Sequence, residues 1–178
     1  IESGAFIQGP EVKSFEADLG KYLDDAHVIA CANGTDALQI ALMALELDPG
    51  DEVIVPSFTF VASVEVIALL GLKPIVVDVD PRSFLLKIED IEASLSPRTK
   101  AIIPVHLFGQ CVNMKSLMAI AKNRDLYVIE DNAQSIGARC IATGDAKEMS
   151  GTIGHIGCTS FYPSKNLGCY GDGGAMIS

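Results

Sequence analysis

Short apolar runs alternate with helix-forming segments along almost the whole chain, and this alternation restricts the possible folds most strongly. After most apolar runs, apolar residues recur every three or four positions, the period of an amphipathic helix. Strands that alternate with helices are typical of doubly wound α/β domains with a largely parallel sheet. We predict strands over residues 27–31, 52–55, 74–79, 101–105, 126–129, 158–162 and 174–178. We predict helices over residues 10–23, 37–45, 61–70, 88–95 and 114–123, and a less regular stretch over residues 138–157.

The composition supports one domain with its own core and argues against several kinds of partner. Of the 178 residues, 49% are hydrophobic, which is enough to bury a substantial core. The formal net charge is -10 and the basic residues form no dense run, so we expect no nucleic-acid or anionic-membrane surface. The longest apolar segments are too short to span a bilayer.

The five cysteines are scattered along the chain, without a CxxC pair or a ligand-like cluster with histidine. We interpret them as reduced thiols in or near the core of a cytoplasmic protein, and we expect no metal site. These residues are Cys31, Cys111, Cys140, Cys158 and Cys169.

We predict that the chemistry of the chain is centred on Lys165, which follows the apolar run 158–162 and precedes the glycine-dense segment 168–174. This position indicates a strand end or a turn in closely packed backbone. A desolvated lysine there has a lowered pKa and can condense with a carbonyl group. Most lysines are solvated surface charges, so the case for Lys165 depends on the groups at the other strand ends.

Residues that directly follow strands are candidates for a site, because doubly wound sheets bind ligands beyond the carboxyl ends of their strands. The segment 33–36 follows the first strand and opens a helix, where free N–H groups and a hydroxyl can bind a phosphate. An ordinary helix N-cap is the alternative. Ser160, five residues before Lys165, offers a second hydroxyl for a phosphate.

Aromatic and acidic side chains follow two other strands. Phe58 or Phe60 could lie flat on an aromatic ligand, although core packing is the simpler explanation for both. Asp131, in the segment 130–135, could hold a protonated ring nitrogen and keep that ring electron-withdrawing, with a capping role as the alternative. Pyridoxal 5'-phosphate requires four things of its binding site: a phosphate-binding segment, an aromatic side chain on its ring, a carboxylate and an amine. The sequence offers all four, and residues 33–36 with Ser160 would form the phosphate cradle.

Two other functions remain as alternatives. A dinucleotide oxidoreductase requires a GxGxxG turn after the first strand, and residues 31–36 lack it. The YxxK spacing of Tyr162 and Lys165 is also one residue short of the YxxxK pair of short-chain dehydrogenases. A catalytically silent binding or assembly domain on the same scaffold is the second alternative.

Six segments give the chain a specific resemblance to the DegT/DnrJ/EryC1/StrS family of nucleotide-sugar aminotransferases. They are GPEV at 9–12, NGTDAL at 33–38, GDEVI at 50–54, PSFTF at 56–60, EDNAQS at 130–135 and SFYPSK at 160–165. The resemblance implies the large domain of a PLP-dependent transferase of fold type I, a three-layer α/β/α sandwich around a mostly parallel seven-stranded sheet. It also implies that residues 1–178 are this PLP-binding large domain, with the C-terminal small domain and some N-terminal sequence absent.

The same resemblance implies roles for individual residues. Lys165 would bind the cofactor covalently and act in catalysis together with Asp131, which would pair with the ring nitrogen. The further contacts implied are Gln134 at the ring hydroxyl, Phe60 on the ring face, and Gly34, Thr35, the Asp36 N–H and Ser160 at the phosphate.

The implied reaction has two halves. Glutamate, the usual donor, gives its amino group to the cofactor while Lys165 moves a proton, and a keto-sugar nucleotide then takes the amino group. Lys165 argues against the branch of the family in which histidine replaces this lysine and the reaction is a dehydration. The segments 31–40 and 158–174 look most like enzymes that aminate C3 of a UDP-linked 2-acetamido-3-keto-glucuronate for surface polysaccharide, with a dTDP-linked sugar as the alternative.

The resemblance also implies a homodimer, because active sites of the family lie at a subunit interface. The absent part usually supplies the arginine for the donor carboxylate, contacts to the sugar and contacts across the subunits to the phosphate. We therefore expect residues 1–178 alone to be a poor catalyst, and full turnover by this piece would contradict that expectation.

Overall fold

The computed structural model describes residues 4–5, 7–141 and 147–178, and helices and strands alternate through them as predicted. The helices are α1 (Pro10–Tyr22), α2 (Gly34–Ala44), α3 (Ala62–Leu69), α4 (Ile88–Ser94), the 3-10 helix η1 (Leu107–Gly109) and α5 (Met114–Arg124). The strands are β1 (Val28–Cys31), β2 (Glu52–Pro56), β3 (Lys73–Val77), β4 (Thr99–Ile102), β5 (Tyr127–Asp131), β6 (Arg139–Ile141), β7 (Lys147–Met149), β8 (Ile156–Ser160) and β9 (Gly174–Ile177). None of the helices described is long and apolar enough to cross a membrane.

Seven strands form one sheet in the order β1-β9-β8-β5-β4-β2-β3. Strand β9 runs antiparallel to its neighbours β8 and β1, and the remaining neighbours are parallel. The carboxyl ends of β5 and β8 therefore lie next to each other, since these two strands pair in parallel. The mostly parallel seven-stranded sheet agrees with the prediction.

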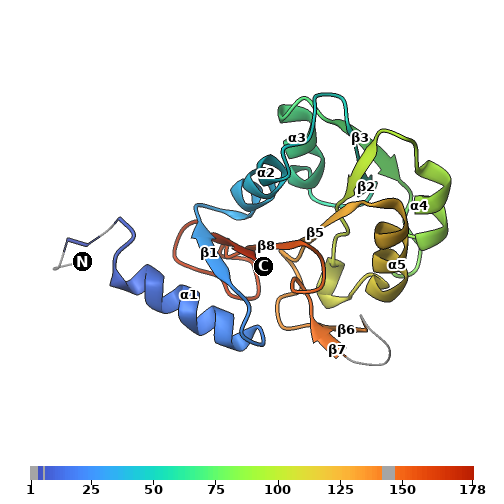
Figure 1. Ribbon diagram of the computed structural model, residues 1–178. Helices are drawn as coiled ribbons and strands as arrows, with labels where there is room; N and C mark the ends of the chain where they lie inside the picture. The colour runs from blue at the N-terminus through green and yellow to red at the C-terminus, as the bar shows by residue number, and fades with distance from the viewer. Residues whose placement is uncertain (1–3, 6, 142–146) are drawn as a thin grey trace.

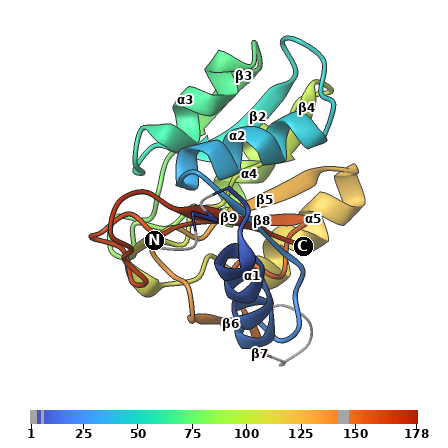
Figure 2. The same ribbon diagram turned by 90° about the vertical axis from the view of Figure 1, so that its left-hand side faces the viewer.

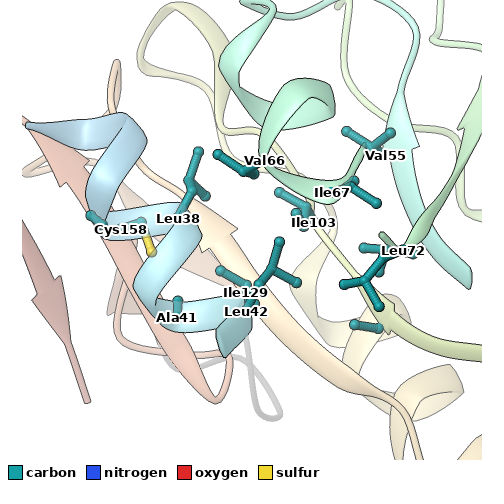
Figure 3. Packing of buried hydrophobic residues seen from close by; sticks show 13 residues of the cluster. Leu38, Ala41, Leu42, Val55, Val66, Ile67, Leu72, Ile103, Ile129 and Cys158 are labelled. Atoms are coloured by element: carbon teal, nitrogen blue, oxygen red, sulfur yellow. The ribbon is translucent and has the colours of Figure 1, made fainter. Parts of the chain in front are cut away.

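The sheet is covered by helices on both faces, because its central strands are apolar on both sides. In β2, Val53 and Val55 pack in a cluster with α2 and α3, whereas Ile54 packs in a cluster with α4 and α5. Fully buried strands of this kind are typical of parallel sheets. Figure 1 shows α2 and α3 together on one side and α4 and α5 on the other, and Figure 3 shows the first cluster. The three-layer sandwich is confirmed.

Helix α1 packs against the edge of the sheet that holds β1 and β9. Its buried Leu19 and Leu23 join a small cluster with Val28, Phe161 and Ile177. Figure 2 shows α1 on the same side of the molecule as β6 and β7, away from α2 and α3. The cluster supports the backbone at Phe161, four residues before Lys165.

The stretch 138–157 contains two elements that the sequence pattern did not predict. Strands β6 and β7 pair antiparallel as a separate two-stranded sheet, and Cys140 in β6 forms a disulfide with Cys111. The prediction of reduced thiols is therefore wrong for these two cysteines. Their Cα atoms are 5.5 Å apart although the residues are separated by 29 positions, a proximity that spacing alone does not reveal.

Candidate functional site

Lys165 lies in a turn that follows β8, at the edge where the parallel strands end. Its backbone N–H donates a hydrogen bond to the carbonyl oxygen of Tyr162 (2.8 Å), which closes the turn. Its side chain is half-buried and lines a cavity. The cavity measures about 390 Å³ and is lined by Phe108, Gly109, Gln134, Ser164, Lys165 and Asn166.

Asp131 is the last residue of β5, and only 6% of it is exposed. The hydroxyl of Ser63 donates to Asp131 Oδ2 (2.8 Å), and the N–H of Ala133 donates to Oδ1 (3.2 Å). Burial raises the pKa of Asp131, and the hydrogen bonds together with the positive charge of Lys165 offset only part of this rise. The site therefore holds a carboxylate whose ionised form needs a cationic partner, as is common where a ligand binds.

Glu130 precedes Asp131 on β5, so its side chain lies on the opposite face of the sheet, where it is fully buried. Its carboxylate accepts hydrogen bonds from the N–H groups of Gly151 (2.9 Å), Ile153 (2.7 Å) and Gly154 (2.5 Å). His106 Nε2 lies 2.7 Å from Glu130 Oε2. Burial alone would raise the pKa of Glu130, but the bonds from His106 and the backbone hold it below its usual value.

The imidazole of His106 serves as a neutral hydrogen-bond donor. The N–H of Val112 donates to His106 Nδ1 (3.2 Å), so the ring proton is on Nε2 and is directed to Glu130. The backbone N–H of His106 donates to the carbonyl oxygen of Asp131 (3.0 Å), and the N–H of Asp131 donates to that of Pro104 (2.9 Å). The backbone that carries Asp131 is thus fixed from both sides.

The N-terminus of α2 is packed tightly against the end of β8. A Cβ atom at Gly34 would lie 2.7 Å from Ser160 Cβ, and one at Gly174 would lie 2.3 Å from the carbonyl oxygen of Asn33. Only glycine permits such contacts, and they bring the Ser160 hydroxyl beside the first turn of α2. The sequence pattern marked both groups but could not show how closely they approach.

The first turn of α2 is capped by its own side chain. Asn33 Oδ1 accepts a hydrogen bond from the N–H of Asp36 (2.8 Å), so the N-cap is present and α2 begins at Gly34, earlier than predicted. The Asp36 N–H, which the resemblance assigns to the phosphate, is therefore engaged within the turn. The N–H groups of Gly34 and Thr35 have no acceptor inside the helix, as at every helix start, and Ser160 lies beside this turn.

Phe58 and Phe60 lie in the connection between β2 and α3, with exposed fractions of 47% and 67%. The simpler explanation of core packing is therefore wrong for both side chains. The ring of Phe58 packs against that of Phe84 at a centroid distance of 5.1 Å. Phe60 keeps its ring accessible at the edge of the sheet that carries Asp131.

Gln134 has a defined orientation in the Lys165 cavity. Its Oε1 accepts a hydrogen bond from the backbone N–H of Phe108 (3.2 Å). The Nε2 of Gln134 is then the amide atom that can donate to a ligand oxygen in the cavity. Phe108 forms part of the cavity wall and was not singled out by the sequence pattern.

The structure brings several predicted residues together and reveals others. Lys165 and Gln134 share one cavity, and Asp131 is close enough for the charge of Lys165 to affect its pKa. Ser63 and His106 were missed, because no local pattern relates a hydroxyl or an imidazole to a carboxylate that far away in sequence. Within the described ranges, no group of three or more His, Cys, Asp or Glu residues is placed to hold a metal ion.

Comparison with known proteins gives matches over the entire chain. A model of the DegT/DnrJ/EryC1/StrS aminotransferase family matches residues 1–178. UDP-2-acetamido-2-deoxy-3-oxo-D-glucuronate aminotransferase of Pseudomonas aeruginosa is 51% identical over 178 residues, which is 100% of this chain and 48% of that protein. The chain thus spans about half the length of the curated relatives that it matches.

Solved structures match equally well. The crystal structure of a DegT DnrJ EryC1 StrS aminotransferase from Brucella abortus has a TM-score of 0.93 at 52% identity, covering 99% of this chain and 48% of that one. The structure of NtdA from Bacillus subtilis with bound cofactor PMP has a TM-score of 0.90 at 40% identity, covering 99% of this chain and 39% of that one.

Proposed function

The chain belongs to the DegT/DnrJ/EryC1/StrS aminotransferase family, and we propose that the protein carrying it transfers an amino group to a keto-sugar nucleotide with pyridoxal 5'-phosphate as cofactor. The proposal rests mainly on one observation, which is that a buried carboxylate and a lysine lie at the same edge of the sheet. Asp131 ends β5, and Lys165 follows the neighbouring strand β8. The cofactor bound to NtdA, at 40% identity, supports the choice of cofactor.

The residues of this chain fit the parts of pyridoxal 5'-phosphate. The tight approach of Gly34 and Ser160 leaves N–H groups and a hydroxyl for the phosphate. The free Nε2 of Gln134 suits the ring oxygen. Burial raises the pKa of Asp131 more than its hydrogen bonds and the charge of Lys165 lower it, so a protonated ring nitrogen would stabilise the ionised carboxylate further. The accessible ring of Phe60 would cover one face of the cofactor.

Each of these side chains then has a task in the proposed reaction. The bound cofactor supplies an electron-withdrawing ring that stabilises negative charge on the carbon that loses its proton. Asp131 would hold the proton on the ring nitrogen. Lys165 Nζ would bind the cofactor and, once displaced by the donor, carry the proton away from the α-carbon of the donor. Gln134 would fix the orientation of the ring.

We propose glutamate as the donor and a UDP-linked 3-keto sugar as the acceptor, for glycan biosynthesis. The Pseudomonas aeruginosa relative, a UDP-2-acetamido-2-deoxy-3-oxo-D-glucuronate aminotransferase at 51% identity, supports this acceptor. We further propose that residues 1–178 are the PLP-binding large domain of a cytoplasmic homodimer. The exposed Phe108 in the wall of the Lys165 cavity and the exposed Phe60 after β2 are candidates for cover by another part of the protein or by its partner. Sedimentation of the full-length protein at micromolar concentration tests for the dimer.

The test of the proposed function uses the full-length protein that carries this chain. It is incubated with pyridoxal 5'-phosphate, glutamate and UDP-2-acetamido-3-keto-glucuronate, and both products are followed by mass spectrometry. We expect 2-oxoglutarate and a UDP-linked 3-amino sugar in equal amounts. If glutamate yields no 2-oxoglutarate with this acceptor or with dTDP-linked keto sugars, the proposed function is wrong.

Substitution of Gly34 by alanine is expected to weaken cofactor binding about tenfold or more, because the new Cβ would lie 2.7 Å from Ser160 Cβ and would separate the two sides of the phosphate cradle. Overpacking of this kind typically costs about 1–3 kcal/mol of stability. The dissociation constant of pyridoxal 5'-phosphate, measured by fluorescence titration of the full-length protein, checks the first expectation.

The double variant Gly34→Ala with Ser160→Gly separates the two effects of that substitution. Ser160→Gly removes the atom that the new Cβ would meet, so thermal stability should recover, whereas the hydroxyl is lost and cofactor binding should stay weak. Wild-type affinity in the single variant would contradict the assignment of the cradle.

A further inference from the structure

Ser63 donates a hydrogen bond to the carboxylate of Asp131 and is itself the end of a short chain of hydroxyl groups. Its side chain is fully buried, and its Oγ lies 2.8 Å from Asp131 Oδ2 and 3.0 Å from Thr59 Oγ1. An ionised carboxylate can only accept, so the proton of Ser63 is directed to Asp131. The proton between the two hydroxyls therefore belongs to Thr59. Thr59 donates to Ser63, and Ser63 donates to Asp131.

The fold holds Ser63 rigidly above the end of β5. Ser63 belongs to the first turn of α3, whose Val66 and Ile67 are buried in one cluster with Ile103 and Ile129. Figure 3 shows Val66 and Ile67 near Ile103, and Ile129 beside Leu42 of α2. Since Ile129 lies two residues before Asp131 on the same face of β5, the same cluster lies beneath both α3 and the Asp131 carboxylate, and so sets the position of the Ser63 hydroxyl.

We propose that Ser63 is a positioning residue for the amino-transfer reaction, which keeps Asp131 ionised and fixed in orientation so that the proton of the pair stays on the cofactor's ring nitrogen. This inference rests on the proposed function. Without the Ser63 hydroxyl, Asp131 becomes the stronger base. The proton would then pass from the ring nitrogen to a carboxylate oxygen, leaving a neutral ring and a neutral carboxyl group.

The hydrogen bond from Ser63 has a large effect on the basicity of Asp131, because few other groups stabilise the ionised carboxylate. The described residues supply two donors to its carboxylate, the Ser63 hydroxyl and the backbone N–H of Ala133. The charge of Lys165 also lowers the pKa of Asp131. The neutral imidazole of His106 donates its proton to Glu130, and burial raises the pKa of the Cys158 thiol, so neither adds a charge beside Asp131 at neutral pH. Substitution of Ser63 changes none of these groups. The hydrogen bond from Ser63 lowers the pKa of Asp131 and so opposes the rise that burial causes.

The experiment compares Ser63→Ala with Ser63→Thr, which retains the hydroxyl, in the full-length protein loaded with pyridoxal 5'-phosphate that carries ¹⁵N in its ring. The ¹⁵N chemical shift distinguishes the protonated from the neutral ring nitrogen without any turnover. Ser150→Ala is the matched control, because Ser150 is also fully buried and its hydroxyl donates to the carbonyl oxygen of Ser135 (2.5 Å), not to Asp131.

For Ser63→Ala we expect the ratio of protonated to neutral ring nitrogen at neutral pH to fall about tenfold, the size set by loss of one hydrogen bond to a charged group. The rate of the half-reaction with glutamate should fall about tenfold or more, with little change in KM for glutamate. Ser63→Thr and Ser150→Ala should both keep the wild-type protonation ratio. A purely structural role of Ser63 would alter stability without changing this ratio.

The possible results separate this inference from the proposed function. If wild type binds no cofactor, or binds it with a neutral ring nitrogen, the proposed function is overturned together with the role of Ser63. If wild type and Ser63→Ala share the same ratio of protonated to neutral ring nitrogen, only the role of Ser63 is overturned. Thr59→Val provides a second variant if Ser63→Ala does not fold. It should lower the protonation ratio by a smaller factor, and an unchanged ratio there would exclude the ordered chain of donors.

Discussion

Replacement of Lys165 by alanine is expected to lower kcat of the full-length protein by about ten-thousandfold or more. The variant would lose both the amine that binds the cofactor and the base that moves the proton, and general acid–base catalysis alone typically contributes about 10²–10⁴-fold. Single-turnover mixing of the cofactor-loaded protein with glutamate measures this step directly. The cavity around Lys165 would keep its other lining residues, so we expect cofactor binding to be weakened and not abolished.

Two control variants support the interpretation of that result. Lys165→Arg keeps the positive charge beside Asp131 but cannot bind the cofactor covalently, so it should be as inactive as alanine. Lys122→Ala on the exposed side of α5 removes one lysine far from the strand ends and should retain full activity. A Lys165→Ala protein within tenfold of wild-type kcat would show that the proton moves by another route.

Substitution of Asp131 by asparagine is expected to lower kcat about a thousandfold while leaving the shape of the site intact. The variant could still accept the hydrogen bond from Ser63, but a neutral amide does not hold a proton on the ring nitrogen. Removal of one preorganised charge-stabilising group typically costs about 10²–10³ in rate. Steady-state kinetics with glutamate, together with the ¹⁵N shift of the ring nitrogen, measures both effects. Near wild-type activity with a neutral ring nitrogen would contradict the role of Asp131.

The same substitution should have an unusual effect on the stability of the cofactor-free protein. Burial raises the pKa of Asp131, so in the pH range just above its ordinary value the folded state binds more protons than the unfolded chain. The free energy of unfolding therefore falls as pH rises through that range. Asparagine carries no charge, so the variant should gain stability relative to wild type from acid to neutral pH. Urea unfolding at several pH values measures this difference, and the opposite trend would contradict it.

Glu130 should show the reverse dependence on pH. Its pKa is lowered in the folded state, so its contribution to stability is present above its ordinary pKa and is lost as pH falls through the lowered value. The contrast arises because Glu130 has four donors on its carboxylate, whereas Asp131 has two. Two adjacent residues on β5 thus have different roles. Glu130 stabilises the fold, and Asp131 can bind a cationic group of a ligand.

The succession of strands and helices could be predicted from the sequence because it depends on local patterns. Apolar runs of four or five residues marked the strands, and the helical period marked what lies between them. The start of α2 was predicted too late, because the hydrogen bond from Asp36 to Asn33 extends the helix to Gly34. The pair β6 and β7 escaped prediction because each strand has only three residues, too few for a pattern.

The candidate site could be predicted only where its residues follow strands. Asp131, Ser160 and Lys165 belong to short segments that mark them, and the fold places them near one another. Ser63 carries no such mark, because its partner Asp131 lies 68 positions away and the contact exists only once α3 packs on the sheet. The disulfide between Cys111 and Cys140 depends on tertiary packing in the same way.

The most direct test of the account identifies the lysine that holds the cofactor. The full-length protein is loaded with pyridoxal 5'-phosphate, treated with borohydride to make the link permanent, and digested for mass spectrometry. We predict a single modified peptide that contains Lys165, and no modified peptide from the Lys165→Ala variant. A cofactor attached to any other lysine, or to none, would contradict the central claim that this edge of the sheet is an aminotransferase site.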